Sequence, residues 1–173
     1  MGYEKVHFLG SFQGGQDAGC EVENLYFNDL ILAQSVLITG GAKRLGQEMA
    51  LSLAEKGWAI ALHYRNSLEE AESTREKIEK TGSDCKLFSA DLENPRESVE
   101  MMKQVLSEFP DLDLLVHNAS VFDESPLVSV DEEVFDRQFD VNFKSPFFMT
   151  QQYINHCTSG HVVNILDTKI QSN

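Results

Sequence analysis

Short apolar runs and longer amphipathic stretches follow one another in a regular order from Ser35 onward. Runs of about four to eight apolar residues are typical of buried strands, whereas apolar residues that recur every three or four positions are typical of helices. The apolar runs predict five strands, at residues 36–39, 58–64, 85–92, 112–116 and 161–165. The amphipathic stretches between them predict four helices, at residues 44–56, 67–82, 94–109 and 131–157.

Two of the predicted helices begin at recognisable caps. Ser67 and Glu70 form a capping-box pattern, in which the Ser67 hydroxyl accepts from the backbone of Glu70 and the Glu70 side chain reaches back. Asn94 precedes Pro95, and proline is favoured in the first turn of a helix, where its missing N–H has no intrahelical partner to lose. The long stretch at 131–157 carries Pro146 in its interior, so a bend or a local break is expected there.

Strands that alternate with helices indicate a parallel sheet that is covered on both faces. With right-handed crossovers the predicted fold is α/β, a doubly wound parallel sheet of the Rossmann type, with a ligand at the carboxyl ends of the strands. The chain has 173 residues, and few of them follow the fifth strand, so the sheet is expected to be truncated after about five strands. Such a sheet is expected to leave an unpaired edge and exposed apolar helix faces.

The two predicted regions of the chain differ in pattern. Residues 35–173 are assigned to an incomplete Rossmann domain, whereas residues 1–34 show no sustained period and are interpreted as a poorly ordered N-terminal extension. The segment Glu23–Asn28 is one residue away from a common protease tag site. A tag remnant, an upstream translated segment and a natural extension therefore all remain open as its origin.

Composition narrows the range of partners. The net charge is -14, which repels nucleic acids and anionic membrane surfaces, so neither is expected as a partner. No apolar run approaches the roughly 18 residues of a membrane span, and no secretory signal is visible, so a cytoplasmic protein is expected. The 3 cysteines are widely spaced and are interpreted as reduced thiols, with no disulfide frame and no metal site.

The segment Thr39–Gly46 carries the most specific chemistry, because it joins a predicted strand to a predicted helix through glycines. Gly40 and Gly46 permit a tight turn and a close approach of the backbone to a ligand. The helix N-terminus that follows offers free N–H groups and a partial positive charge. This arrangement predicts a site for the pyrophosphate of a dinucleotide.

The end of the second strand indicates which dinucleotide is bound. An acid there binds the ribose 2′-hydroxyl of NAD, whereas a basic residue accommodates the 2′-phosphate of NADP. After the second strand the first acidic residue is Glu69, which already lies in the next predicted helix. The predicted cofactor-binding residues at this end are His63, Tyr64, Arg65, Asn66 and Ser67. Arg65 suits a phosphate, so NADP(H) is the predicted cofactor and residues 35–173 become an NADP-binding domain. The alternative is that Arg65 is a solvated loop residue and Ser67 only a cap.

Other positions along the same edge complete the predicted cofactor site. Arg44 lies inside the glycine turn, where its charge can reach the phosphates; the alternative is an exposed residue of the first helical turn. Asp91 can accept from an adenine amino group or cap the next turn, and both remain open. The full predicted cofactor set outside the second strand's end is Gly40, Arg44, Leu45, Gly46, Asp91, Leu92, Asn118, Ala119 and Ser120.

Together these positions resemble the short-chain dehydrogenase/reductase family over Ser35 to Asn173. The landmarks that carry the resemblance are Thr39-Gly40 with Gly46, Asp91, His117-Asn118-Ala119-Ser120 and Asn142. Three departures point to the branch of pteridine reductases and bacterial dihydromonapterin/dihydrofolate reductases: Arg44 for the usual middle glycine, Ser120 for a glycine, and Asp167 for the catalytic serine. A further departure is His117, which stands where asparagine is usual.

The resemblance implies that NADPH reduces a dihydropterin. It implies that Phe122 stacks the pterin, that Arg44 and Ser120 also contact it, and that Asp167 and Asn142 belong to the catalytic machinery. The alternative for Asp167 is a turn residue that caps the loop before Lys169, and the alternative for Asn142 is an amide satisfied within its helix.

The family's Tyr-x-x-x-Lys is expected about a dozen residues after Asp167 and is not in the chain, since neither Tyr64 nor Tyr153 has a lysine four residues later. The chain is therefore expected to be an inactive fragment. A homo-oligomer is implied for the full-length parent and less so for this fragment. Two alternatives remain: a non-catalytic NADP-binding module, and a generic short-chain dehydrogenase acting on an alcohol or ketone, against which Asp167 and Phe122 count.

Overall fold

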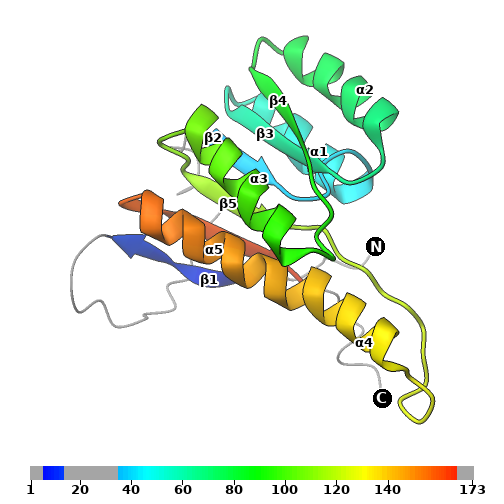
Figure 1. Cartoon of the computed structure of the whole chain (residues 1–173). Helices are drawn as coiled ribbons and strands as arrows, with labels where there is room; N and C mark the ends of the chain where they lie inside the picture. Colours follow the sequence, from blue (N-terminus) through cyan, green and yellow to red (C-terminus); the bar gives the residue numbers. More distant parts are fainter. Residues whose placement is uncertain (1–5, 14–34, 167–173) are drawn as a thin grey trace.

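The structure is a computed structural model that describes residues 6–13 and 35–166. Its central feature is a sheet with the strand order β1-β6-β5-β2-β3-β4 (Figure 1). From β2 to β6 the strands are all parallel, which confirms the predicted doubly wound α/β fold. The strands are β1 Val6–Gln13, β2 Ser35–Ile38, β3 Ala59–Tyr64, β4 Cys85–Ser89, β5 Leu114–His117 and β6 Ser159–Ile165.

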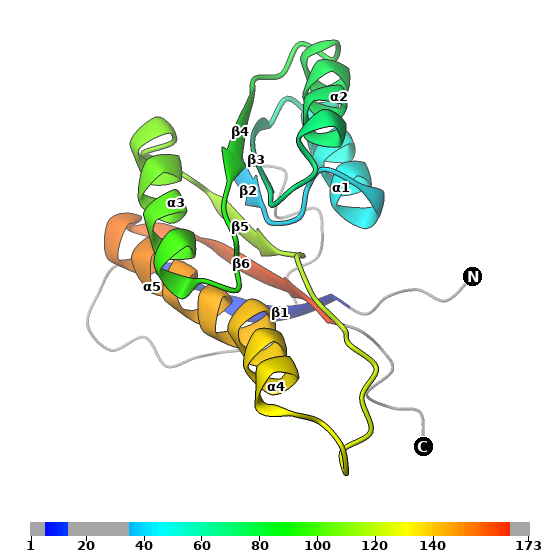
Figure 2. The same cartoon turned by 45° about the vertical axis from the view of Figure 1, so that its right-hand side comes forward.

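Helices cover both faces of this sheet, as Figure 2 shows: α1 and α2 lie on one face and α3 and α5 on the other. Their bounds are α1 Arg44–Ala54, α2 Leu68–Glu79, α3 Pro95–Glu108, α4 Glu132–Phe139 and α5 Ser145–His156, with a π-helical turn η2, Asp140–Lys144, between the last two. No helix in the described part of the chain combines the length and the apolar character needed to span a bilayer.

Alternate residues of β2 supply the two halves of the core, because successive side chains of a strand point to opposite faces. Val36 and Ile38 are fully buried in the cluster that contains Ala50 of α1 and Ile78 of α2. Leu37 is fully buried in the other cluster, which contains the methionines of α3 and Met149 of α5. The run of four buried residues in β2 thus reflects a strand that is covered on both sides.

Only one of the two predicted caps is present. The Asn94 side chain accepts from the backbone N–H of Arg96 and caps α3, as expected. Ser67 occupies the N-cap position of α2, but its side chain makes no capping hydrogen bond. The predicted capping box is therefore wrong, and the reason is that Glu70 pairs with Lys43 across the turn that follows β2, at 3.0 Å.

The predicted long helix is interrupted immediately before Pro146, as its sequence led us to expect. The Ser145 N–H reaches back to the carbonyl of Asp140, which closes the wider π-helical turn, and Pro146 then lies in the first turn of α5. Along this composite helix the side chains of Phe135, Phe139, Phe143 and Phe147 form one row, with ring centroids 5.9, 5.0 and 6.2 Å apart. All four rings are exposed.

Strand β1 corrects two expectations. It pairs antiparallel with β6, from Val6 opposite Ile165 to Gln13 opposite Ser159, with a register shift between Phe8 and Ser11. The edge of β6 that was expected to be open is therefore paired, and the first 34 residues are not without secondary structure. Gly10 lies at the shift, and this irregularity hides the strand from a search for strict alternation.

Deletion of residues 1–13 tests the contribution of β1. We expect the variant to lose about 1–3 kcal/mol of unfolding free energy, because β6 loses an antiparallel neighbour and regains an open edge. Urea unfolding measures the stability, and hydrogen exchange locates the change. Amides of β6 should lose protection while those of β2 and β3 keep theirs; equal protection of β6 in both proteins would contradict the role of β1.

Candidate functional site

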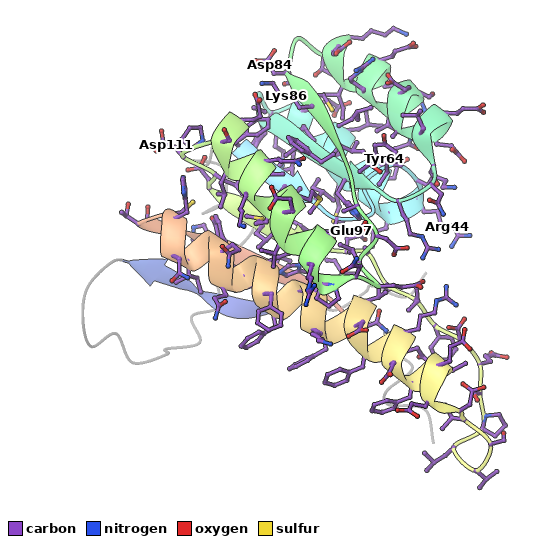
Figure 3. The ribbon with its side chains drawn as sticks, in the orientation of Figure 1. Arg44, Tyr64, Asp84, Lys86, Glu97 and Asp111 are labelled. Atoms are coloured by element: carbon purple, nitrogen blue, oxygen red, sulfur yellow. The ribbon has the colours of Figure 1, made fainter. Side chains whose placement is uncertain are left out.

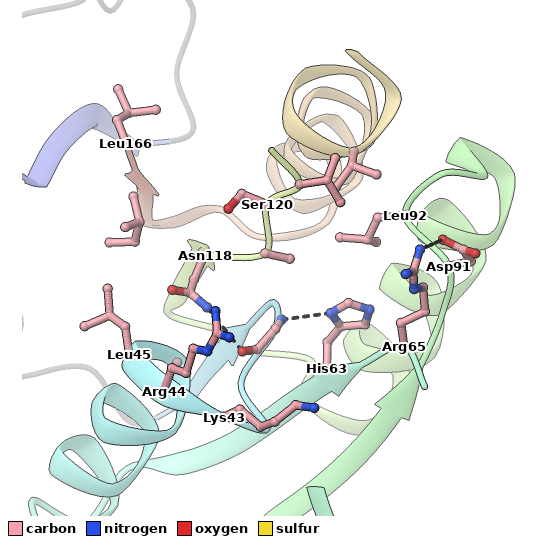
Figure 4. A pocket seen from close by; sticks show the side chains of 16 residues that line it. Lys43, Arg44, Leu45, His63, Arg65, Asp91, Leu92, Asn118, Ser120 and Leu166 are labelled. Atoms are coloured by element: carbon pink, nitrogen blue, oxygen red, sulfur yellow. Dashed lines mark hydrogen bonds and ion pairs between the residues drawn. The ribbon is translucent and has the colours of Figure 1, made fainter. Parts of the chain in front are cut away.

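A cavity of about 620 Å³ opens where the parallel strands β2 to β6 end (Figure 4). In the close-up, Arg65 and Asp91 lie at one end of the cavity and Leu45 and Leu166 at the other. This position is the one expected for a ligand of a doubly wound sheet. The cavity is lined by Gly40, Lys43, Arg44, Leu45, Gly46, His63, Arg65, Asp91, Leu92, Asn118, Ala119, Ser120, Val121, Val141, Ile165 and Leu166.

The turn after β2 brings two stretches of backbone close together. A Cβ atom on Gly46 would lie 2.3 Å from the carbonyl oxygen of Gly40, so no larger residue fits at this position. Gly40 has φ +63°, in the left-handed region that favours glycine, and a Cβ there would lie 3.1 Å from Cα of Ala119. The result is a cradle of closely packed backbone at the N-terminus of α1, an arrangement that suits a phosphate.

Thr39 and Asn118 join this turn to the end of β5. The Thr39 hydroxyl accepts from the backbone N–H groups of Asn118 at 2.9 Å and Ala119 at 3.0 Å. The Asn118 amide in turn donates to the carbonyl oxygens of Thr39 and Gly40, at 2.9 and 3.2 Å. Asn118 therefore fixes the cradle as well as lining the cavity, a role that the sequence did not reveal.

His63 connects the turn to the far wall of the cavity. Its Nδ1 accepts from the N–H of Gly40 at 3.0 Å, so its Nε2 carries the proton and donates to the carbonyl of Ala90 at 3.1 Å. Burial of the ring lowers the pKa of His63 to about 4, so the imidazole stays neutral near neutral pH. The side chain thus acts as a fixed spacer between the cradle and the segment that leads to Asp91.

Arg44 has φ +53°, the one positive value among non-glycine residues of the described chain. A side chain in the left-handed region costs about 1–2 kcal/mol, which explains why glycine suits this position. Its side chain is exposed and projects from the molecule near the start of α1 (Figure 3). Lys43, which precedes it, also lines the cavity and forms the ion pair with Glu70.

Arg65 is already paired with carboxylates, which the sequence did not predict. Its guanidinium lies 2.6 Å from Glu93 and 3.5 Å from Asp91. Glu93 also accepts from Arg137 of α4 at 2.7 Å, and Arg137 holds Asp123 at 2.9 Å. These two carboxylates raise the pKa of Arg137 above its ordinary value. A phosphate that binds Arg65 at this end of the cavity must therefore displace a carboxylate from it.

Asp91 caps the turn that follows β4, which is one of the two roles left open for it. Its carboxylate accepts from the backbone N–H of Glu93 at 3.0 Å, and its carbonyl accepts from the N–H of Asn94 at 3.0 Å. The side chain nevertheless lines the cavity, so the predicted contact with adenine stays a prediction.

Asn142 clamps the loop that follows β5. It lies in the π-helical turn, where its Oδ1 accepts from the Val121 N–H at 2.9 Å and its Nδ2 donates to the Val121 carbonyl at 2.8 Å. The amide is therefore not satisfied within its own helix, which was the alternative for Asn142, and its predicted catalytic role stays a prediction. The clamp fixes the residue next to Phe122, whose ring is 64% exposed.

The structure brings together most of the predicted cofactor residues, but not all. Of the predicted cofactor residues, Tyr64, Asn66 and Ser67 do not line the cavity. Of the residues predicted for catalysis or substrate binding, Asn142 and Phe122 do not line it either, and Asp167 lies outside the described residues. The lining adds five residues that were not predicted: Lys43, Val121, Val141, Ile165 and Leu166. Lys43 could have been found, because it lies inside the glycine turn. The apolar ones carry no signal beyond that of ordinary core positions.

His117 at the end of β5 is buried just behind the cavity. Its Nε2 lies 2.9 Å from the hydroxyl of Thr150, whereas its Nδ1 has no hydrogen-bond partner among the described residues. Burial lowers the pKa of His117 to about 4. At pH values between about 4 and the ordinary histidine pKa of about 6.5, His117 is protonated in the unfolded chain and neutral in the folded chain.

Replacement of this histidine tests the sign of the pH dependence. Stability should fall as the pH is lowered from 6.5 toward 4.5, because the unfolded state binds more protons, by on the order of 1 kcal/mol per pH unit for each buried histidine. His117→Asn should flatten the curve of unfolding free energy against pH by about that slope. Urea unfolding at several pH values measures it. His156→Asn, which removes an exposed histidine, is the matched control.

Comparisons with known proteins agree with this geometry. The family described as short chain dehydrogenase matches residues 34–169. A 3-oxoacyl-(acyl-carrier-protein) reductase, FabG of Staphylococcus aureus, is 33% identical over 137 residues, which cover 78% of this chain and 56% of that protein. The chain therefore spans about half the length of the curated relatives it matches.

Solved structures show the same likeness. FolM alternative dihydrofolate reductase 1 from Brucella canis, complexed with NADP, has a TM-score of 0.67 and 32% identity, covering 71% of this chain and 50% of that one. A short chain dehydrogenase from Burkholderia cenocepacia, also with NADP, has a TM-score of 0.68 and 28% identity, covering 72% of this chain and 51% of that one. The parallel sheet, the glycine cradle and the match over residues 34–169 lead to one conclusion: the chain belongs to the short-chain dehydrogenase/reductase family.

Proposed function

We propose that this chain is the cofactor-binding part of an NADPH-dependent reductase of a pterin or dihydrofolate-type substrate. The observation that carries the proposal is Arg44, a charged residue held at φ +53° on the wall of the cavity, where glycine would be less strained. The likeness to FolM from Brucella canis, a dihydrofolate reductase by name, supports the same substrate class.

NADP(H) is the cofactor that the comparisons support, since several similar structures were solved with NADP or NADPH. The residues of the cavity fit this cofactor: the glycine cradle would hold the pyrophosphate, and Arg65 the 2′-phosphate. When bound, the cofactor supplies the hydride. The chain's own residues bind it, orient it and, through His63, keep the pyrophosphate site at a fixed separation from the end that holds the 2′-phosphate.

Proton delivery is proposed to involve Asp167, and Asn142 is proposed to assist by holding the loop after β5. No tyrosine in the 173 residues is followed four positions later by a lysine, so the family's usual acid is not among them. We therefore propose that this chain binds cofactor without steady turnover. A cytoplasmic location remains part of the proposal.

A homo-oligomer is proposed for the complete enzyme. The exposed row of four phenylalanines on α4, η2 and α5 is the surface best suited to it, because exposed aromatic patches mark protein contacts.

A second candidate function is reduction of a 3-oxoacyl thioester, which the likeness to FabG of Staphylococcus aureus favours. This candidate falls within the generic short-chain dehydrogenases acting on a ketone. The third candidate, a non-catalytic module that senses NADP, predicts cofactor binding with no affinity for either substrate class. Substrate binding in the presence of cofactor therefore separates the three.

Cofactor preference is the first test. The chain should bind NADP+ more tightly than NAD+, and Arg65→Ala should lower the affinity for NADP+ about fivefold to tenfold while leaving NAD+ unchanged. The factor is modest because Arg65 gives up a carboxylate when it takes the phosphate. Isothermal titration calorimetry measures both. Arg75→Ala, which removes an equal charge on α2, is the control. Equal affinity for the two cofactors would refute the assignment.

Substrate class is the second test. With NADP+ present, dihydrobiopterin should bind, and Phe122→Ala should weaken that binding by about 1–3 kcal/mol because an aromatic stack is lost. NADP+ affinity should stay the same. Val128→Ala alters another exposed residue of the same loop and is the control. Binding of a 3-oxoacyl thioester instead, unaffected by Phe122→Ala, would favour the second candidate function.

A further inference from the structure

A chain of ion pairs runs from the end of β3 to the loop after β5. Arg65 pairs with Glu93, Glu93 with Arg137, and Arg137 with Asp123. The four side chains come from different elements: the end of β3, the turn before α3, helix α4 and the loop after β5. Each is about one third exposed, so water reaches all of them and none is locked by burial.

Glu93 is shared between the two arginines through a single atom. Its Oε1 accepts from Arg65 at 2.6 Å and from Nε of Arg137 at 2.7 Å. Arg137 also donates to both carboxylate oxygens of Asp123, at 3.2 and 2.9 Å. If Arg65 moves to another anion, Glu93 keeps Arg137 and is not left as an unpaired charge. The exchange therefore costs less than breaking an isolated ion pair.

Only one form of the cofactor can drive this exchange. A 2′-phosphate is a dianion with several acceptor oxygens and competes well for a guanidinium. A ribose with a 2′-hydroxyl carries no charge and leaves Arg65 with Glu93. Displacement of the carboxylate therefore reduces the binding free energy of NADP and not that of NAD.

We propose that Glu93 is a specificity-determining residue that holds Arg65 in the absence of a 2′-phosphate and passes it to that phosphate, with Arg137 as the partner that it retains. This inference rests on the proposed binding of NADP(H) at Arg65. On this proposal Glu93 opposes NADP binding by competing for Arg65, and Arg137 weakens that competition by pairing with Glu93. Substitutions of Glu93 and Arg137 should therefore change the affinity for NADP+ in opposite directions.

The test uses the 173-residue chain and calorimetric titration with NADP+ and NAD+. Glu93→Gln should bind NADP+ about twofold to fivefold more tightly and NAD+ equally well, since the nearer of the two carboxylates that compete for Arg65 is gone and only Asp91, at 3.5 Å, remains. Arg137→Gln should bind NADP+ about twofold to fivefold more weakly, since Glu93 then depends on Arg65 alone. Glu100→Gln, which removes the same charge from the outer face of α3, is the matched control and should change neither affinity.

A double-mutant cycle separates this exchange from simple attraction at a distance. In the Glu93→Gln background, Arg137→Gln should have no further effect on NADP+ affinity, because the carboxylate through which it acts is absent. An equal loss in both backgrounds would show that Arg137 attracts the phosphate through space and would overturn the proposal. Glu93→Asp, which keeps the charge but shortens the side chain, is a second variant and should also tighten NADP+ binding.

Two further outcomes would overturn the inference, and they differ from a failure of the proposed function. If Glu93→Gln weakens NAD+ binding, Glu93 binds the ribose directly and does not act by competing with the 2′-phosphate of NADP. If Glu93→Gln changes the melting temperature but alters both cofactor affinities by the same factor, Glu93 is only a structural brace. In both cases Arg65→Ala would still reduce NADP+ affinity. If Arg65→Ala has no effect, the proposed cofactor contact and the inference fall together.

Discussion

Close packing of backbone against backbone, where β2 turns into α1, sets the shape of the cavity at the ends of the parallel strands. Gly46 allows the first turn of α1 to lie against the carbonyl of Gly40, and a single methyl group at Gly46 would overlap that oxygen. Hydrogen bonds between Thr39 and Asn118 then tie the turn to the end of β5, and a hydrogen bond from the Gly40 N–H to His63 ties it to β3. The N–H groups of the helix start are consequently presented to the cavity in a fixed position.

Local charge, and not the overall field, decides what the cavity can bind. The chain carries a net charge of -14, yet Lys43, Arg44 and Arg65 gather along one cavity. Two of these cations are already held by carboxylates, Lys43 by Glu70 and Arg65 by Glu93. An anionic ligand therefore meets cations whose orientation is set beforehand, but it must compete for them. We therefore expect this competition to lower the affinity for an anionic ligand and to make selectivity sensitive to a few acidic side chains.

The sequence was most informative where a periodic pattern or a steric requirement acts locally. The five parallel strands, the cap at Asn94 and the break near Pro146 follow from apolar runs and from the chemistry of one or two residues. Strand β1 escaped because its pairing uses backbone groups and its register shifts beside Gly10. The ion pair between Arg65 and Glu93 could not be predicted from the sequence, because Glu93 lies 28 residues further along the chain. No local sequence pattern relates two charged surface residues at that separation. The Ser67 cap failed for the same reason, since Glu70 has a partner in another turn.

The π-helical turn between α4 and α5 helps the four exposed phenylalanines to lie on one side of the composite helix. On a regular α-helix, residues spaced four apart drift steadily around the axis, by about 40° at each step, so four phenylalanines would spiral away from one side. The wider turn at Asp140–Lys144 rotates the chain less per residue and offsets this drift midway. The ring pair that spans the turn's start, Phe139 and Phe143, is also the closest of the row, at 5.0 Å. One irregular turn, placed just ahead of a proline, thus helps residues spaced four apart to keep their rings next to one another along the helix.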